Sequence, residues 1–304
     1  MSLPPKYQLE RYLLDPEECR RTLIREEILP TLRECPMCHG PVSLVNNAST
    51  WKCSRKNCRH GQTVFYTTFF ERSRISCNRV LEFGYNWLLG MQSNQLKQYF
   101  GMSSNTVADW IQNYQQLIEL DLESRDIGEK QIGGDGIIVQ IDEAKFGKRK
   151  FNRGHRVQGV WVVGGVEITE ERKVFAVSVP DRSGATLLAI IREHVAPGSH
   201  IFTDCWAGYR TEDLEAHEFE HVTVNHNEGF IDHETGVHTN NIEATWRGMR
   251  FHMSHKHMNR ALIDGHLKTF IWKRHYRGSR WGALLNAIKR VDWHDLEVAD
   301  EDDV

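Results

Sequence analysis

Three acidic residues stand where they could share a metal ion. Asp142 ends an apolar run that starts at Ile137, Asp204 ends the run 200–204, and Glu243 lies in a segment expected to be helical. Carboxylates at the ends of buried strands are rigid and poorly hydrated, and three together repel one another unless a cation lies between them. Such oxygen ligands suit Mg²⁺ or Mn²⁺, the metals of phosphoryl-transfer sites. Because a lone acid at a strand end is more often a cap or turn residue, the interpretation depends on the surrounding sequence.

Two short-spaced cysteine pairs predict a second metal site, for zinc. Cys35 and Cys38 form one pair, Cys53 and Cys58 the other, with a strand-sized segment between them. Four thiolates at this spacing can surround Zn²⁺ tetrahedrally, and the ion would supply much of the folding energy of so small a segment. Free structural cysteines and a redox pair are the alternatives, and a histidine close to each pair could replace a ligand.

Residues 77–118 are predicted to be helical. A turn at Gly101 separates two amphipathic segments, and Ser103 or Ser104 would cap the second. A helix–turn–helix of this kind can hold its second helix in the major groove of DNA, with Ser104 and Asn105 near phosphates or base edges. A plain helical hairpin has the same pattern.

After about residue 136 the chain alternates strand and helix signals, which predicts an α/β (α+β) fold class. Three consecutive strand signals indicate an antiparallel meander and the later alternation indicates parallel additions, so we expect a mixed sheet flanked by helices. Residues 121–136, charged and then rich in glycine, are expected to be a linker. The predicted strands are 137–141, 157–166, 174–179, 201–203 and 219–224, and the predicted helices are 185–195, the neighbourhood of Leu214, 241–252 and about 259–276.

The net charge of −3 hides an uneven distribution. Residues 292–304 hold seven acids and no Lys or Arg, so the rest of the chain is mildly basic, and this tail is expected to be disordered. No apolar stretch is long enough to cross a membrane, and residues 1–6 lack a signal-peptide pattern. Together with the odd total of seven cysteines, this favours a reducing compartment.

Three blocks of sequence resemble those of a transposase family. Residues 141–154 (IDEAKFGKRKFNRG) and 159–165 (GVWVVGG) are similar to the first catalytic block of the ISXO2-like insertion-sequence transposases, a set that includes the eukaryotic Merlin elements. Residues 203–209 (TDCWAGY) resemble the second block, and residues 224–226 with 235–247 (TGVHTNNIEATWR) resemble the third.

This resemblance covers nearly the whole chain and implies an RNase H-like fold, a DDE triad and cut-and-paste DNA transposition. By position the triad is Asp142, Asp204 and Glu243. Departures from the family's usual residues, at Asn241, Ala244 and 207–208, remove none of these carboxylates. The implied domains are an N-terminal helical segment (1–32), a zinc-ribbon-like module (33–70), a helix-turn-helix-like module (75–120), an RNase H-like DDE catalytic domain (136–278) and the acidic tail (292–304).

The partner that the resemblance implies is double-stranded DNA, both transposon ends and target, bound by a homo-oligomer. Mg²⁺ or Mn²⁺ would serve strand cleavage and transfer, with Asp142 bridging two ions, and Zn²⁺ would be structural. Basic residues on a loop after the first strand, and two arginines one and two helical turns beyond Glu243, would contact DNA, with a solvated surface role as the alternative for each. These basic residues are Lys145, Lys148, Arg149, Lys150, Arg153, Arg247 and Arg250.

Two other functions stay open. A domesticated descendant could bind DNA without transposing, and a transcription regulator could be built on the zinc and helical modules, although it would leave the acids without a purpose. The four-residue gap between Cys53 and Cys58 is more typical of the eukaryotic elements and favours a nucleus.

Side chains next to the acids are expected to have supporting roles. Glu143 should point to the opposite face of the strand from Asp142, as a neighbour rather than a ligand. Trp161, Trp206 and Trp246 are expected in the core, with base stacking as the alternative for Trp206 because it lies beside Asp204.

Overall fold

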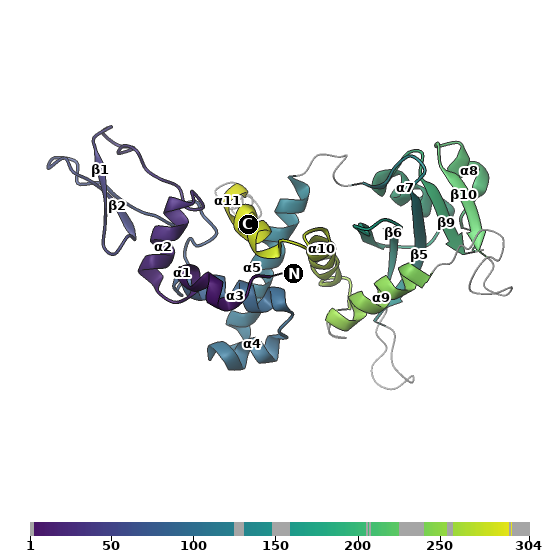
Figure 1. Ribbon diagram of the computed structural model, residues 1–304, viewed down its shortest axis with the longest axis horizontal. Coiled ribbons are helices and arrows are strands. Elements are labelled where there is room, and N and C mark those ends of the chain that lie inside the picture. Colours follow the sequence, from purple (N-terminus) through teal and green to yellow (C-terminus); the bar gives the residue numbers. More distant parts are fainter. Residues whose placement is uncertain are drawn as a thin grey trace, which may run out of the picture. The chain divides into compact units, whose positions relative to one another are not determined.

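The computed structural model of the chain describes residues 3–124, 131–147, 159–204, 206, 208–224, 240–253, 258–291 and 293. Four of the basic residues predicted to contact DNA (Lys148, Arg149, Lys150 and Arg153) and nearly all of the acidic tail lie outside these ranges. The chain forms two units, residues 1–121 with 276–304 and residues 122–275 (Figure 1). None of the helices in the described ranges combines the length and apolar character that crossing a bilayer requires.

The first unit joins a small antiparallel sheet to a set of helices. The sheet has the order β1-β2-β3; Cys35 and Cys38 precede β1, Cys53 ends β2, and Cys58 lies in the turn between β2 and β3. The elements of this unit are a 3₁₀ helix (Lys6–Leu9), α1 (Glu10–Leu13), α2 (Pro16–Arg25), β1 (Val42–Val45), β2 (Thr50–Cys53), β3 (Gly61–Thr63), α3 (Cys77–Leu89), α4 (Ser93–Phe100), α5 (Ser104–Glu123) and α11 (Arg280–Arg290).

Local sequence explains the helix–turn–helix geometry of α4 and α5. Gly101 ends α4 with a positive φ of 64°, a conformation that glycine adopts without steric cost. The hydroxyl of Ser103 accepts the N–H of Thr106 at 3.1 Å and so caps α5, as predicted. Tyr114 of α5 is fully buried, and its hydroxyl donates to the carbonyl oxygen of Val80 at 2.8 Å, which fixes α5 against α3.

Helix α11 was not predicted from the sequence, and α5 extends beyond its predicted end. Trp281 of α11 is buried and meets the ring of Tyr12 edge-on, with 5.7 Å between the ring centroids. Arg290, the last residue of α11, forms an ion pair with Asp121, a fully buried carboxylate in the last turns of α5. The predicted linker therefore begins too early, because Asp121 belongs to the core of the first unit.

The second unit contains a five-stranded mixed sheet, as predicted. Its order is β10-β9-β5-β6-β7, with β5, β6 and β7 antiparallel and with β9 and β10 parallel to β5. A second, two-stranded sheet pairs β4 with β8. The elements are β4 (Ile132–Gly133), β5 (Ile138–Phe146), β6 (Val160–Glu167), β7 (Val174–Val179), α7 (Gly184–His194), β8 (Val195–Ala196), β9 (His200–Asp204), α8 (Thr211–Glu215), β10 (Glu220–Val224), α9 (Asn240–His252) and α10 (Ile263–His275).

Helices cover both faces of this sheet (Figure 1). Because side chains alternate along a strand, neighbouring residues of β5 enter two different cores. Ala144 and Phe146 pack with α9 and α10, whereas Val139 and Ile141 pack with α7. The sheet thus separates two apolar layers, and every acid on β5 can be assigned to one face.

Candidate active site and zinc centre

The register of two parallel strands places Asp142 beside Asp204. Strands β5 and β9 pair with Ile138 opposite His200 and Gln140 opposite Phe202. Asp142 and Asp204 each follow two residues later, so their side chains project from the same face of the sheet at neighbouring positions. Each acid also receives a backbone N–H, that of Glu143 at 2.8 Å and that of Trp206 at 3.0 Å, which orients the carboxylates.

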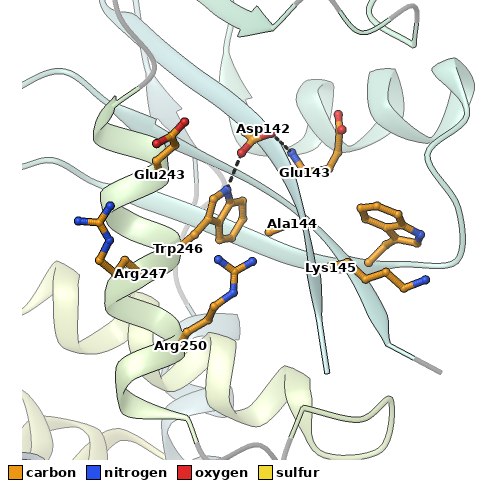
Figure 2. A pocket seen from close by; sticks show the side chains of 9 residues that line it. Asp142, Glu143, Ala144, Lys145, Glu243, Trp246, Arg247 and Arg250 are labelled. Carbon is orange, nitrogen blue, oxygen red and sulfur yellow. Dashed lines mark hydrogen bonds between the residues drawn. The ribbon is translucent and has the colours of Figure 1, made fainter. Parts of the chain in front are cut away.

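Helix α9 brings Glu243 to the same face. Ile242, Trp246 and Met249 are buried at helical spacing and fix α9 on the sheet. Glu243 therefore lies on a separate stripe of the helix, four residues before Arg247 and seven before Arg250. Figure 2 shows these three side chains together with Asp142 around one pocket.

Two residues hold α9 and Asp142 together. The indole Nε1 of Trp246 donates to Oδ2 of Asp142 at 2.9 Å (Figure 2). Gly164 pairs with Asp142 across β5 and β6, and a Cβ at Gly164 would lie 2.5 Å from the Trp246 ring. A residue larger than glycine would therefore displace the indole that orients the acid.

Gln140 is a contact that sequence reasoning missed. It points to the same face as Asp142, is 2 % exposed, and its Oε1 accepts the N–H groups of Asn241 and Ile242, each at 3.2 Å. The first turn of a helix has N–H groups without intrahelical partners, and Gln140 supplies an acceptor for two of them. It thereby fixes the N-terminus of α9, next to Glu243, to the strand that carries Asp142.

The three acids interact electrically. Burial raises the pKa of Asp142, the donors Trp246 and Glu143 lower it, and the negative charges of Asp204 and Glu243 raise it again. Partial burial lowers the pKa of the Arg250 guanidinium, and the charge of Asp142 acts in the opposite direction. The structure thus brings Asp142 within electrostatic reach of both Asp204 and Glu243, and the arginines lie beside Asp142 and Glu243 in the pocket lining.

A pocket of about 520 Å³ opens at these residues. The paired part of β5 and β9 ends at Gln140, so the later part of β5 borders the pocket with side chains from both faces. The carboxylates are spread more widely than the thiols of the cysteine cluster, the group of described residues whose ligand atoms all lie within 4.8 Å of one another. The pocket is lined by Asp142, Glu143, Ala144, Lys145, Trp161, Glu243, Trp246, Arg247 and Arg250.

The acid next to Asp142 points to the other face, as predicted. Oε2 of Glu143 lies 3.5 Å from Nη1 of Arg182, a second residue that the sequence did not indicate. Burial raises the pKa of Glu143, and the approaching hydroxyl of Tyr209 lowers it. Glu143 is therefore an ion-pair partner at the side of the pocket.

The three tryptophans are buried to different extents. Trp246 is in the core, as expected, and Trp161 is partly buried. The prediction was wrong for Trp206, which lies beyond the end of β9 and is 42 % exposed. The reason is tertiary: an apolar ring enters a core only where other elements cover it.

The predicted zinc ligands lie in one cluster. Sγ of Cys35 is 3.7 Å from Sγ of Cys58, and Sγ of Cys38 is 3.6 Å from Sγ of Cys53. A Zn–S bond of about 2.3 Å in a tetrahedral site places sulfurs about 3.8 Å apart, so the four thiols fit this ion. They come from the turn before β1 and from the end and following turn of β2, which the short sheet holds together.

The thiols of this cluster differ in acidity, and one of them has a lowered pKa. Burial acts to raise the pKa of Cys38, but the N–H of Gly40 and the other three thiols lower it to about 7. The N–H of His60 lowers the pKa of Cys58, while the neighbouring thiols and burial raise it to about 11. One thiol ionises easily and then opposes ionisation of the others, a repulsion that a shared cation offsets.

The residues predicted to contact DNA fall in several places. Ser104 and Asn105 are exposed at the N-terminus of α5 in the first unit. Arg247 and Arg250 line the pocket, as does Lys145. Lys145 lies within β5 rather than on the predicted loop, and its Nζ is 5.2 Å from the centroid of the Trp161 ring.

Comparison with known proteins identifies the second unit. The profile described as the ISXO2-like transposase domain matches residues 127–277. An uncharacterized transposase-like protein of Haemophilus influenzae is 37% identical over 120 residues, which are 39% of this chain and 93% of that protein. The class defined by these matches is that of the transposases with a DDE domain. The chain belongs to the ISXO2-like transposase family.

Solved structures give a weaker likeness. The Mos1 transposase paired-end complex with left transposon end has 11% sequence identity and a TM-score of 0.22, over 70% of this chain and 78% of that chain. A pre-cleavage Mos1 transpososome has 10% identity and a TM-score of 0.21, over 69% and 78% of the two chains. Scores this low support no argument about the present chain.

Proposed function

We propose that this protein is a metal-dependent DNA transposase that cleaves DNA and joins the ends to a target. The observation that carries the proposal is that Asp142 shares a pocket with Glu243 and feels the charges of both Glu243 and Asp204, in a family of transposases. The sheet order, with three antiparallel strands followed by two parallel ones, supports an RNase H-like fold for this unit. The residues 1–32, 33–70, 75–120 and 136–278 remain our proposed domains.

The donor set fits Mg²⁺ or Mn²⁺. Each of the three side chains offers hard oxygen atoms, and N–H donors already orient two of them. We propose that Asp142 would hold metal ions together with Asp204 and with Glu243, so that the last two acids need not touch each other. Bound ions would activate a water or a DNA 3′-OH and stabilise the leaving oxygen.

The protein's own residues prepare this chemistry. Trp246 fixes the direction of Asp142, and Gln140 fixes the helix that carries Glu243. Arg247 and Arg250 place positive charge on the pocket wall, where a phosphodiester would otherwise meet three negative carboxylates. Burial of Asp142 reduces its hydration and strengthens the interactions that it makes.

DNA contacts follow from the exposed basic and polar residues. Arg247, Arg250 and Lys145 would bind the backbone near the acids, and Lys148, Arg149, Lys150 and Arg153 would extend this contact. Ser104 and Asn105, at the capped end of α5, would meet phosphates or bases of the transposon end. We also propose a homo-oligomer on DNA, a Merlin-like element and a nuclear location, the last two on the Cys53–Cys58 spacing alone.

The test is nicking of supercoiled plasmid DNA by the full chain with Mn²⁺ or Mg²⁺. We expect nicking by the wild type, none with EDTA, and none by Asp204→Asn or Glu243→Gln. Glu170→Gln is the matched control, because it neutralises an exposed acid of the same unit away from the pocket, and it should nick normally.

The outcomes separate the candidate functions. Metal-dependent nicking that disappears in Asp204→Asn supports a transposase and excludes a contaminating nuclease. Tight binding of DNA without nicking in either metal would instead identify a domesticated DNA-binding protein. Nicking that persists in all triad variants would place the chemistry elsewhere and end the proposal.

A further inference from the structure

An arginine is held between two tryptophans beside the acids. The guanidinium carbon of Arg182 lies 3.9 Å from the centroid of the Trp161 ring and 4.5 Å from that of the Trp206 ring. The guanidinium of Arg182 also forms an ion pair with Glu143, whose side chain is only 3 % exposed. The guanidinium is therefore fixed by two aromatic faces and a buried carboxylate, a cation–π arrangement.

The surrounding backbone makes this stack rigid. Arg182 precedes α7 in a turn where Oδ1 of Asp181 accepts the N–H of Ser183 and the hydroxyl of Thr186, both at 2.9 Å. The Trp206 indole lies against Gly208, where a Cβ would come within 2.6 Å of its Nε1. The position of the indole is thus set on one side by glycine and on another by Arg182.

The outer part of Trp206 is open and close to the acids. Trp206 is 42 % exposed, and its backbone N–H donates to Oδ1 of Asp204. The exposed part of this large flat ring is therefore free to lie against another flat ring. Exposed aromatic rings backed by a cation are surfaces on which unpaired nucleobases stack.

We propose that Trp206, backed by Arg182 and Trp161, is a stacking platform for one nucleobase that leaves the duplex next to the scissile phosphate. The inference rests on the proposed function for its DNA substrate. A base within a duplex already stacks on its neighbours, so the platform selects for bases that are unpaired or extruded. Because Trp206 follows Asp204 by two residues, the extruded base remains near the phosphate at the acids.

The probe is a short duplex with one bulged 2-aminopurine nucleotide, compared with the same duplex fully paired. Both are titrated with the full chain without added divalent metal, and binding and 2-aminopurine fluorescence are recorded. We expect tighter binding of the bulged duplex and quenching of its fluorescence. Trp206→Ala should weaken that binding by about 5- to 140-fold, the range for loss of one base–aromatic stack, and abolish the quenching.

Three variants distinguish stacking from a loss of folding. Trp206→Phe keeps a ring and should retain most of the preference, whereas Gly208→Ala should weaken it by displacing the indole. Tyr7→Ala removes an aromatic residue that is 70% exposed in the other unit and should change nothing. Unchanged affinity of every variant for the paired duplex reports an intact fold.

The platform and the proposed function fail in different ways. An undiminished preference for the bulge in Trp206→Ala, or no preference in the wild type, overturns the platform even if Mn²⁺-dependent nicking is normal. Absent nicking with a Trp206-dependent preference overturns the transposase activity and leaves the base-binding site.

Discussion

Loss of the acceptor at Gln140 should release the start of α9 while leaving the sheet intact. In Gln140→Leu the side chain keeps a similar size but no longer accepts the N–H groups of Asn241 and Ile242. Removing a helix N-cap acceptor costs about 0.5–2 kcal/mol. A local loss of about 1–2 kcal/mol corresponds to hydrogen exchange about 5- to 30-fold faster at these two amides.

Hydrogen exchange of the full chain, followed by mass spectrometry of peptides from α9, measures this directly. Gln140→Glu retains an oxygen acceptor at the helix N-terminus and should preserve protection. Gln131→Leu makes the same chemical change in the same unit without touching α9, and should leave α9 unaffected. Peptides of β6 should exchange as in the wild type.

The functional consequence is a displaced Glu243. If Gln140 acts by positioning, Gln140→Leu should weaken Mn²⁺ binding and slow nicking, and Gln140→Glu should restore the helix. Unchanged exchange at Asn241 and Ile242 in Gln140→Leu would refute the reasoning, because it would show that other contacts hold the helix start.

Three further outcomes follow from other contacts. Cys58→Ser should lower bound zinc from about one ion per chain to a small fraction, measured by atomic emission, because a tetrahedral site loses one thiolate; full retention would contradict the assignment. Gly164→Ala should lower the free energy of unfolding, measured in urea, by about 1–3 kcal/mol, because the added methyl group overpacks against Trp246. In a double-mutant cycle, Trp246→Phe should reduce this loss. Strict additivity of the two losses would argue against the clash. Burial of His194 against Phe175 lowers the pKa of its imidazole from 6.5. As the pH drops below about 6.5, the unfolded state therefore binds the proton before the folded state does, and the free energy of unfolding falls. The same pH dependence of stability in His194→Gln would contradict this.

The sequence predicted the elements whose signals are local. Strand β7 has its predicted bounds, and the apolar residues of α9 recur at helical spacing. The spacing of the four cysteines also predicted their cluster, because short spacing places the two members of each pair close together. Helix α11 could have been found in the same way, since Trp281, Leu284 and Ile288 recur on one face.

Other contacts of the site could not be predicted from the sequence, for physical reasons. Arg182 meets Trp161 and Trp206 through the tertiary fold alone, and no local pattern pairs residues so far apart. Gln140 did leave a signal: a polar residue inside an apolar strand must find a hydrogen-bond partner when buried. The sequence could not show that this hydrogen-bond partner is the start of α9.

Strand alternation explains how two adjacent acids acquire different tasks. Asp142 enters the layer of α9, where Trp246 and Glu243 meet it, whereas Glu143 enters the layer of α7, where Arg182 meets it. A one-residue shift of β5 would exchange these surroundings and place Glu143 beneath the indole of Trp246. The antiparallel pairing of Asp142 with Gly164 opposes such a shift, because Trp246 fits only over a residue without a side chain. The glycine that admits the indole therefore also fixes which acid faces the helix, and the ion pair of Glu143 follows from the same register.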